Sequence, residues 1–202
     1  MIKLKKYKIS RRLGAPVFEK CQTAKYTRSE ERKRKSKSSY SGVSEYGKQL
    51  VEKQKARYTY GIREGQLKKY VREAEKQKGI GVTDYFICSL ERRVDNVVYR
   101  LSFAETRKKA RQMVSHGHIT VNGRKIRIPS RALRVGDVVG IREASKNKKN
   151  FDGMAELQKE RKIPSWLSFD NKTSAGTVKE LPTTTPQDIL FDVSRVFEYY
   201  SR

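Results

Sequence analysis

The chain has 202 residues, of which 47 are Lys or Arg and 22 are Asp or Glu, giving a formal net charge of +25. A charge of this size repels itself in an isolated compact protein, so it indicates a polyanionic partner. Hydrophobic residues make up 36% of the chain, which is too many for full disorder and few for an enzyme with a deep core. The length allows one large domain or two small ones.

The positive charge is concentrated in two blocks. Residues 1–40 carry 14 basic and 3 acidic side chains and residues 90–150 carry 16 and 5, so each block has a net charge of +11. Residues 151–202, with 7 basic and 8 acidic side chains, have a net charge of −1. A solvated surface is the usual explanation of one charge run, but two such blocks favour contact with nucleic acid. A basic membrane-binding helix would need a wide apolar face, which the run at 32–37 lacks.

Cysteine spacing and hydropathy exclude several other classes of protein. Cys21 and Cys88 lie 67 positions apart, which predicts neither a disulfide framework nor a zinc site, so reduced thiols in the cytosol are expected. No run of about 18 apolar residues is present to span a membrane. The first residues, MIKLKKYKISRRLG, lack the apolar stretch of a secretory signal. We therefore predict no membrane partner.

The first 43 residues are expected to form a basic extended arm. Arg11 and Arg12 precede Gly14 and Pro16, and residues 28–41 are almost entirely charged or small and polar. Such a segment cannot bury enough apolar area to offset the entropy of ordering it. We therefore expect the arm to become ordered on RNA.

Two helices are predicted to follow the arm. The first covers residues 44–58, with Ser44 as the N-cap, Glu45 in the first turn, and Tyr46 and Leu50 on one face. The second runs from residue 62 to about residue 78. Its apolar residues follow helical spacing and are interpreted as core, namely Leu67, Tyr70, Val71 and Ala74.

The spacing next predicts a long helix over residues 83–101 and a shorter one over residues 106–115. The apolar face of the long helix contains Phe86, Leu90, Val94, Val97, Val98 and Leu101. Its opposite, polar face contains Glu91, Arg92, Arg93, Asn96 and Arg100. The shorter helix directs Ala110, Met113 and Val114 inward and is otherwise basic.

Beyond residue 118 the period changes to two, which is typical of strands. Ile119 and Val121 belong to one alternating run, and Ile126 and Ile128 belong to a second. The Asn-Gly pair at 122–123 favours a two-residue hairpin between them, because both residues tolerate positive φ. A third strand is predicted at about residues 137–141. Two helices and a small antiparallel sheet thus coincide with the second basic block.

The last quarter of the chain is expected to be looser. Trp166, the only tryptophan, is interpreted as a packing anchor, and residues 170–187 are predicted to form a loop. Residues 189–200 are rich in apolar side chains and are expected to dock on the helical region. Because this quarter has no excess of positive charge, we expect it to contact protein rather than RNA. Charge reversal at Asp188, Asp192 or Glu198 should then leave RNA affinity unchanged.

The sequence contains no catalytic or metal-binding pattern that we recognise. His116 and His118 are the only histidines, and without another ligand nearby they are interpreted as donors to RNA phosphate or ribose. No nucleophile elbow, zinc-protease motif or phosphate-binding loop occurs. Cys88 is interpreted as core, and Cys21 has no neighbouring histidine. We therefore predict no catalytic residue, no metal and no cofactor.

RNA binding, by contrast, has a physical basis in this sequence. A helix bearing Arg and Lys beside a hairpin turn can contact a phosphate backbone on two sides, and such contacts position a protein without reading sequence. Duplex RNA is recognised through its shape, so a rigid helix-and-hairpin platform suits a folded RNA junction. Several tyrosines lie among basic residues and are candidates for base stacking, namely Tyr7, Tyr26, Tyr40, Tyr58 and Tyr60.

Several stretches of the chain resemble a known family. Residues 90–139, LERRVDNVVYRLSFAETRKKARQMVSHGHITVNGRKIRIPSRALRVGDVV, resemble the RNA-binding module named after the fourth protein of the bacterial small ribosomal subunit, the S-four protein. Residues 44–79, SEYGKQLVEKQKARYTYGIREGQLKKYVREAEKQKG, look like that protein's helical domain, as do PSWLSFD at 164–170 and FEYYSR at 197–202. The module also occurs in pseudouridine synthases, tyrosyl-tRNA synthetases and a heat-shock ribosome factor. The match to the helical domain makes the resemblance specific.

The resemblance implies an α+β fold with a basic extended N-terminal arm (1–43) and a helical domain (44–89). A module of two helices and a small antiparallel sheet (90–150) is inserted, and a C-terminal segment (151–202) docks on the helical domain and completes it. The implied function is that of a structural protein of the small ribosomal subunit. Such a protein binds small-subunit rRNA directly at a junction in the 5′ domain, nucleates subunit assembly and influences translational accuracy. The expected partners are that rRNA, neighbouring small-subunit proteins and messenger RNA where it enters the ribosome. Cytoplasmic ribosomes are the expected location, with organellar ribosomes left open.

The resemblance also carries RNA contacts over by position. In the module they are Arg92, Arg107, Lys109, Arg111, Gln112, His116, His118, Asn122, Arg124 and Lys125. In the helical domain they are Tyr46, Lys48, Gln54, Lys55, Arg57, Tyr60 and Gln66. Arg11 and Arg12 are further candidates in the arm.

The chain departs from the family's pattern at three places. Many relatives carry a Cys-rich N-terminal zinc site, of which only Cys21 remains here. The segment KSSYSG replaces the usual Pro-Gly-Gln-His-Gly before the helical domain, and Gly65 stands where an arginine is usual.

Two alternative functions use the same RNA-binding module. An RNA-modifying enzyme would need a separate catalytic domain, and the long N-terminal arm and helical domain argue against a ribosome-rescue factor.

Overall fold

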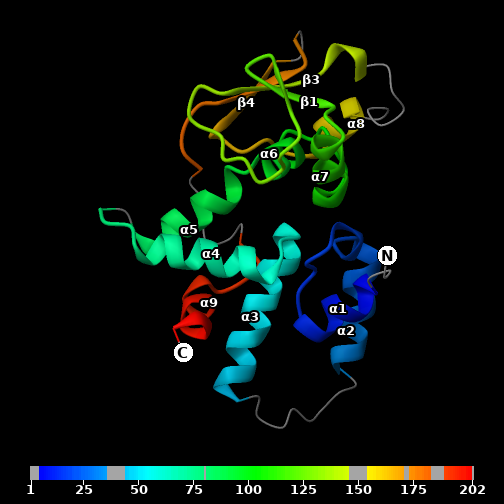
Figure 1. Ribbon diagram of the computed structural model, residues 1–202. Helices are drawn as coiled ribbons and strands as arrows, with labels where there is room; N and C mark the ends of the chain where they lie inside the picture. The colour runs from blue at the N-terminus through cyan, green and yellow to red at the C-terminus, as the bar shows by residue number, and fades with distance from the viewer. Residues whose placement is uncertain are drawn as a thin grey trace. The chain divides into compact units, whose positions relative to one another are not determined.

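The computed structural model of the protein describes residues 5–35, 44–79, 81–145, 154–170, 173–182 and 189–201. These residues have the expected α+β fold. Their contacts divide the chain into two compact units, one of residues 1–76 and 185–202 and the other of residues 77–184. Figure 1 shows the helices and strands of both units. In this part of the chain, no helix is long and apolar enough to cross a membrane.

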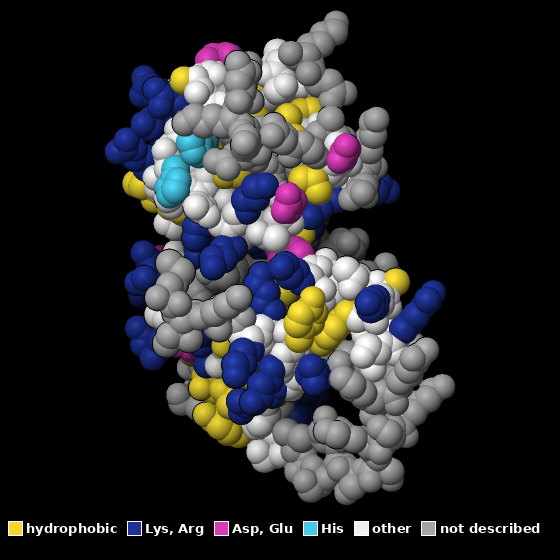
Figure 2. All heavy atoms as spheres, turned by 90° about the vertical axis from the view of Figure 1, so that its right-hand side faces the viewer, with side chains coloured by type: hydrophobic (Ala, Val, Ile, Leu, Met, Phe, Trp, Pro, Cys, Tyr) yellow, Lys and Arg dark blue, Asp and Glu magenta, His cyan; other side chains and the backbone are white. Residues whose placement is uncertain are grey.

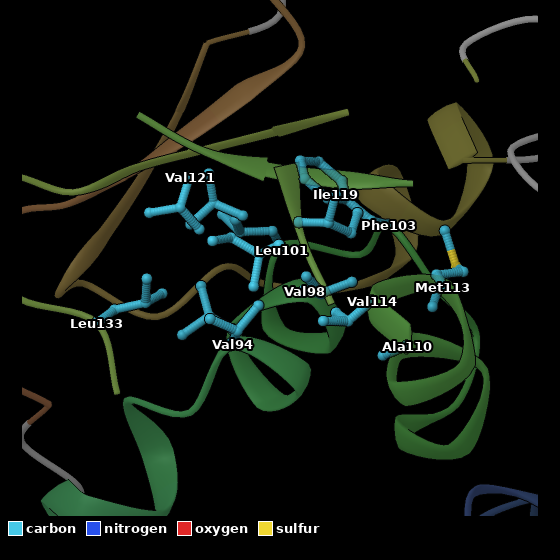
Figure 3. Close-up of a cluster of buried hydrophobic side chains, with 14 of the residues drawn as sticks. Val94, Val98, Leu101, Phe103, Ala110, Met113, Val114, Ile119, Val121 and Leu133 are labelled. Carbon is cyan, nitrogen blue, oxygen red and sulfur yellow. The ribbon is translucent and has the colours of Figure 1, made fainter. Parts of the chain in front are cut away.

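The unit of residues 77–184 contains helices and an antiparallel sheet, and two of the helices cover one face of the sheet. The helices are α5 (Val82–Glu91), α6 (Val94–Arg100), α7 (Arg107–Ser115) and α8 (Met154–Glu160), with a 3-10 turn, η2, at Glu143–Ser145. The strands are β1 (Ile119–Val121), β2 (Arg124–Ile126), β3 (Val138–Ile141), β4 (Leu167–Asp170) and β5 (Ala175–Val178), in the order β2-β1-β3-β5-β4. Figure 3 shows that Val98 of α6 and Val114 of α7 meet Ile119 of β1 between the two layers. All three are fully buried, so this layer is the core of the unit.

The predicted hairpin is confirmed, but its second strand ends at Ile126, so Ile128, which was predicted to belong to it, lies outside the strand and is 64% exposed. Strands β1 and β2 pair antiparallel with Ile119 opposite Ile126 and Val121 opposite Arg124. Asn122 and Gly123 connect them with φ values of 51° and 76°, the positive pair that a tight hairpin turn of this twist requires. Strand β3 pairs with the other edge of β1, so the third predicted strand is also confirmed.

The loop predicted over residues 170–187 is wrong for its first part, because strands β4 and β5 extend the sheet beyond β3. Both strands have four residues, and Gly176 interrupts the apolar alternation of β5, so the period of two was too short to recognise. Trp166, just before β4, is 2% exposed in the core and is confirmed as a packing anchor. Residues 154–170 and 173–182 thus belong to the unit of the sheet, whereas the expected division assigned 151–202 to the helical domain.

The long helix predicted over residues 83–101 is also wrong, because it breaks at Arg92 and Arg93. Arg93 has an extended backbone (φ −66°, ψ 139°) and forms an isolated bridge with Ala132. The Val94 amide donates to the Arg131 carbonyl, and the Leu133 amide donates to the Arg92 carbonyl. The passing loop therefore takes hydrogen bonds that a continuous helix would make internally. The break also buries part of the face expected to be polar, namely Glu91, Arg93 and Asn96.

The other unit is helical. Its elements are α1 (Lys6–Leu13), the 3-10 turn η1 (Glu19–Cys21), α2 (Ala24–Lys35), α3 (Glu45–Tyr60), α4 (Glu64–Glu75) and α9 (Val193–Tyr200). The helices predicted around residues 44–58 and 62–78 are confirmed as α3 and α4. Ser44 caps α3 as predicted, because its Oγ accepts a hydrogen bond from the Gly47 amide at 3.2 Å.

The N-terminal segment is not the extended arm that the sequence predicted. Between helices α1 and α2 it buries Leu13, Val17, Phe18 and Cys21, and Val51 and Tyr58 of α3 pack against them. The net charge of residues 1–40 did not reveal this apolar group, because the count covers the whole basic block. Residues 36–43 lie outside the described part of the chain.

Candidate nucleic-acid interface

Helix α7 presents a basic surface. Thr106 caps its start through a hydrogen bond from the Lys109 amide to Oγ1 (3.1 Å), and Gly117, with φ 73°, lies just beyond its end. Ala110, Met113 and Val114 fix the buried side of the helix. Its exposed and half-exposed side chains are therefore the polar ones, Arg107, Lys108, Lys109, Arg111 and Gln112.

Two of these arginines are held by side chains of α6. Arg107 Nε donates to Asn96 Oδ1 at 2.9 Å, and the Arg107 guanidinium lies 4.3 Å from the centre of the Tyr99 ring. Arg111 contacts Asp95 Oδ2 with both Nε (3.0 Å) and Nη2 (2.9 Å). Arg107 and Arg111 are four positions apart and therefore lie on the same side of α7. Their orientation is fixed by the packing of α6 against α7.

The hairpin turn is fastened to the sheet. Asn122 Nδ2 donates to Asp137 Oδ1 at 2.8 Å, and Asn122 Oδ1 accepts the Val138 amide at 2.8 Å. Asn122, a predicted RNA contact, thus holds the turn in place with its own side chain. Arg124 and Lys125 follow it at the exposed start of β2.

Further cations, which were not among the predicted contacts, lie near the hairpin. Arg127, Arg131, Arg134 and Arg142 are all exposed. The charge of Arg127, then burial, then the charge of Arg142 lower the pKa of Lys125 below its ordinary value. Arg127 was detectable in the sequence, because it lies just beyond the end of β2 and only two positions from Lys125. Arg142 is distant in sequence, so only the sheet brings it close.

The two histidines lie in the same region. Their ring centres are 6.0 Å apart, and His118 Nδ1 lies 3.0 Å from Ser145 Oγ, whereas the His116 side chain is exposed. Figure 2 shows both histidine side chains next to Lys and Arg side chains on the unit that contains the sheet. Among the described residues, no group of three His, Cys, Asp or Glu side chains is placed to hold a metal ion.

Most of the basic candidates in the helical unit have acidic neighbours. Lys55 pairs with Glu52 at 2.7 Å, and Lys48 pairs with Glu45. Arg57 donates to Gln54 at 3.3 Å and lies 3.7 Å from Glu64. The exposed or half-buried candidates of this unit are Arg11, Arg12, Tyr46, Lys48, Gln54, Lys55, Arg57 and Gln66.

Tyr60 is the exception among the candidates of this unit. Its ring is 7% exposed and packs edge-on against Phe191 at 6.3 Å, so it is not placed to stack on a base. Of the other tyrosines considered for stacking, Tyr7 and Tyr26 pack against each other and Tyr58 packs on Phe18. Tyr40 lies outside the described residues.

The chain's C-terminal helix α9 packs on α3 through polar contacts. Gln49 Nε2 donates to Glu198 Oε2 at 3.0 Å, and the Asp192 amide donates to Glu52 Oε2 at 2.9 Å. Tyr200 Oη donates to Glu64 Oε1 at 2.6 Å. The Glu198 carboxylate therefore faces a protein group of the same unit, and α9 is held to both α3 and α4.

Comparison with known proteins agrees with this geometry. Residues 2–92 match the family described as "Ribosomal protein S4/S9 N-terminal domain", and residues 92–139 match the "S4 domain". The small ribosomal subunit protein uS4 of Sulfurihydrogenibium sp. is 43% identical over 203 residues, covering 96% of this chain and 95% of that protein. The uS4 protein of Syntrophomonas wolfei is 46% identical over 159 residues, 79% of this chain and 76% of the relative. That of Lachnospira eligens is 43% identical over 170 residues, 84% and 86%.

Proposed function

The chain belongs to the uS4 family of small ribosomal subunit proteins, and on that premise we propose how it engages RNA. The family is a structural component of the ribosome and not an enzyme, which removes the RNA-modifying alternative. The protein is a constituent of the small subunit, and its partners are the RNA and proteins of that subunit.

We propose that the main RNA contact is the basic surface formed by α7 and the β1–β2 hairpin. The observation that carries this proposal is the group of exposed cations at the hairpin, Arg124, Lys125, Arg127 and Arg142. The lowered pKa of Lys125, caused first by the charge of Arg127, agrees with their closeness. Such a cluster is unfavourable in the free protein and becomes favourable when a phosphate backbone lies on it. The contacts proposed here are Arg92, Arg107, Lys109, Arg111, Gln112, His116, His118, Arg124, Lys125, Arg127 and Arg142.

The helical unit contributes a second set of proposed contacts. Tyr46 is 49% exposed beside α9, and Arg11 and Arg12 are exposed in the last turn of α1. Lys48, Gln54, Lys55, Arg57 and Gln66 complete the set. Tyr60 and Asn122 are proposed to act through the structure, because one is buried and the other holds the hairpin turn.

The finer role follows from the family resemblance. We propose that the binding site is a junction in the 5′ domain of small-subunit rRNA, that binding nucleates assembly, and that the protein influences translational accuracy. Messenger RNA entering the ribosome is a further proposed partner, and cytoplasmic ribosomes are the proposed location. Two compact units in one chain support this role, since each presents side chains suited to phosphate contact.

The test is the salt dependence of binding to a 5′-domain rRNA fragment, with random-sequence RNA of equal length as competitor. A log–log slope on the order of −5 or steeper is expected, because each neutralised phosphate contributes about −0.7 to −0.9. Preference for the fragment should persist at high salt. Equal binding to both RNAs would contradict the proposal.

A matched pair of variants locates the surface. Replacing Arg124 and Lys125 by Gln removes two charges from the hairpin and should reduce the slope by about 1.5 to 2. Replacing Lys162 and Lys179 by Gln removes two exposed charges from the same unit, outside the proposed contacts. The second variant should keep nearly the native slope. Equal reductions of the slope in both variants would show that the RNA-binding surface is not centred on the hairpin.

A further inference from the structure

Beneath the basic surface of α7, two carboxylates are buried among arginines. Glu91, the last residue of α5, is 0% exposed, and Asp95, in the first turn of α6, is 4% exposed. A buried charge is costly unless it is paired and hydrogen-bonded. Both carboxylates meet this requirement with more than one cationic or amide partner, and each set of partners leads to α7.

Asp95 joins a buried arginine to a surface arginine. Arg93, 1% exposed, donates from Nε to Asp95 Oδ1 (3.0 Å) and from Nη2 to Oδ2 (2.8 Å). Arg111, whose side chain is 33% exposed, contacts the same Oδ2 with its Nε and Nη2. Arg93 alone would neutralise this carboxylate. The bond to Arg111 is therefore more than burial of Asp95 demands.

Glu91 is connected to Arg107 of α7 through the side-chain amide of Asn96. It accepts two hydrogen bonds from Arg100, at 2.9 and 2.8 Å, and one from Asn96 Nδ2 at 2.8 Å. Asn96 is itself 2% exposed, and its Oδ1 accepts from Arg107 Nε. Glu91 thus sets the orientation of the Asn96 side-chain amide, and in this orientation Asn96 Oδ1 faces Arg107.

The network stays positive. Four guanidinium groups (Arg93, Arg100, Arg107 and Arg111) against two carboxylates (Glu91 and Asp95) leave a net charge of +2. The two arginines of α7 are held from below by the other helix while the surface above them remains cationic.

We propose that Asp95 and Asn96 are positioning residues for RNA binding, holding Arg111 and Arg107 in the orientation in which they meet RNA phosphate. This inference rests on the proposed function. A held guanidinium has already lost its rotamer freedom, so binding does not have to remove it again. Its planar fork also matches phosphate only in a defined orientation. Asp95 and Asn96 themselves do not contact RNA.

For the variant Asp95→Asn, positioning and simple electrostatics predict opposite changes in affinity for RNA. It removes one negative charge, so electrostatics alone predicts tighter binding to any RNA. Positioning predicts binding to the 5′-domain fragment that is about 2- to 10-fold weaker, with binding to random RNA unchanged or tighter. The control Glu180→Gln makes the same charge change at an exposed site and should not weaken either RNA.

A double-mutant cycle separates positioning from general destabilisation. If Asp95 acts through Arg111, then Asp95→Asn should have little further effect in an Arg111→Gln background. Additive losses would overturn the inference, as would fragment binding by a folded Asp95→Asn variant that equals or exceeds the native level. Failure of the native protein to prefer the fragment would instead overturn the proposed function.

The variant Asp95→Asn leaves Arg93 buried without its charged partner. If that variant does not fold, Arg111→Lys tests the same inference. Lysine keeps the charge at a partly exposed site but has no fork to meet the carboxylate with two bonds. Binding to the fragment should weaken about 2- to 10-fold. Arg124→Lys on the exposed hairpin makes the same replacement without such a partner and should have less than half that effect. Equal effects of the two would contradict positioning by Asp95.

Discussion

At the scale of single residues, Glu64 connects α4 to two other helices of its unit. Tyr200 Oη donates to it at 2.6 Å and Lys53 Nζ at 2.9 Å. Burial by itself would raise the pKa of Glu64. The hydrogen bonds from Tyr200 and Lys53 and the charges of Lys53 and Arg57 outweigh burial and hold this pKa below the ordinary value of 4.5. The resulting stabilisation is complete above that value and is lost as pH falls through the lower pKa of the folded protein.

Replacing Tyr200 by Phe should therefore destabilise the helical unit in a pH-dependent way. Loss of the hydrogen bond should raise the pKa of Glu64 and lower the free energy of unfolding by about 1 kcal/mol at pH 7, because the carboxylate is partly exposed. The difference from the native protein should shrink in acid, where Glu64 is protonated in both. Urea unfolding at several pH values measures this. Tyr199→Phe keeps the ring on which Lys53 lies and should change little.

Single residues also show where sequence reasoning about the site ends. Basic positions on α7 and the hairpin were predictable, because helical spacing and the Asn-Gly turn place them outside. Asp95 was not, since its burial depends on the break at Arg93 and on Arg111, which is 16 positions away. Tyr60 and Tyr46 have the same side chain on one helix, yet only packing against Phe191 shows that Tyr60 is core.

At the scale of elements, strand β5 packs so closely on the helices that it permits no side chain at Gly176. A Cβ atom there would lie 2.4 Å from both Leu101 Cδ1 and Cδ2, and Leu101 is fully buried. Gly176→Ala should lower the free energy of unfolding by about 1–3 kcal/mol, the usual cost of overpacking a core.

The control for this change is Gly140→Ala on the neighbouring strand β3. There the nearest atom to a Cβ is Thr120 Oγ1 at 3.4 Å, which is close to ordinary contact. Chemical denaturation of the two variants should therefore differ clearly. Equal stability would show that β5 is not packed tightly on Leu101.

Helix α9 offers a prediction about function as well as stability. Asp192 caps it, with Oδ1 accepting the Arg195 amide at 3.4 Å, and its own amide is bound by Glu52. Asp192→Ala should cost about 1 kcal/mol of stability. Asp192→Asn keeps the cap and should cost less. Neither should change affinity for the rRNA fragment, and a large loss with Asp192→Asn would show that this end of the chain contacts RNA. Asp188, for which the same outcome was expected, lies outside the described residues.

Elements were predictable where their pattern is local. The hairpin and helices α3, α4 and α7 follow from spacing, caps and turn residues. The break between α5 and α6 did not, because the apolar spacing continues through it and only the bridge from Arg93 to Ala132 interrupts the helix. Strands β4 and β5 are short and pair with each other, and β5 joins them to the sheet by pairing with β3, where Gly176 lies opposite Val139. Long-range pairing rather than local pattern therefore places them in the sheet.

At the scale of the whole molecule, composition predicted the class of partner better than it predicted the boundaries of the units. The net charge of +25 indicated a polyanion, and the chain belongs to a ribosomal family. The boundary predicted near residue 151 coincides with a change in net charge along the sequence. The structure instead divides the chain near residues 76 and 185, because β4, β5 and Trp166 share a core with α6 and α7.

The same charge predicts opposite responses of folding and binding to salt. Cations held close together, such as Lys125 beside Arg127, repel one another in the free protein, and salt screens that repulsion within a Debye length of about 10 Å at 0.1 M. The free energy of unfolding of the free protein should therefore rise as potassium chloride is added. Affinity for the rRNA fragment should fall over the same range, because fewer counterions are released on binding.

Measured together, these two slopes test whether the positive surface is built for a partner. Bound RNA stabilises the folded state by an amount that depends on its affinity. As salt weakens binding, the melting temperature of the complex should fall, while that of the free protein should rise, so the two values should converge. Potassium glutamate at equal ionic strength separates screening from chloride ions bound at particular sites. If salt instead destabilised the free protein, its ion pairs would outweigh its repulsion. The clustered cations would then be an ordinary solvated surface, with no dependence on RNA.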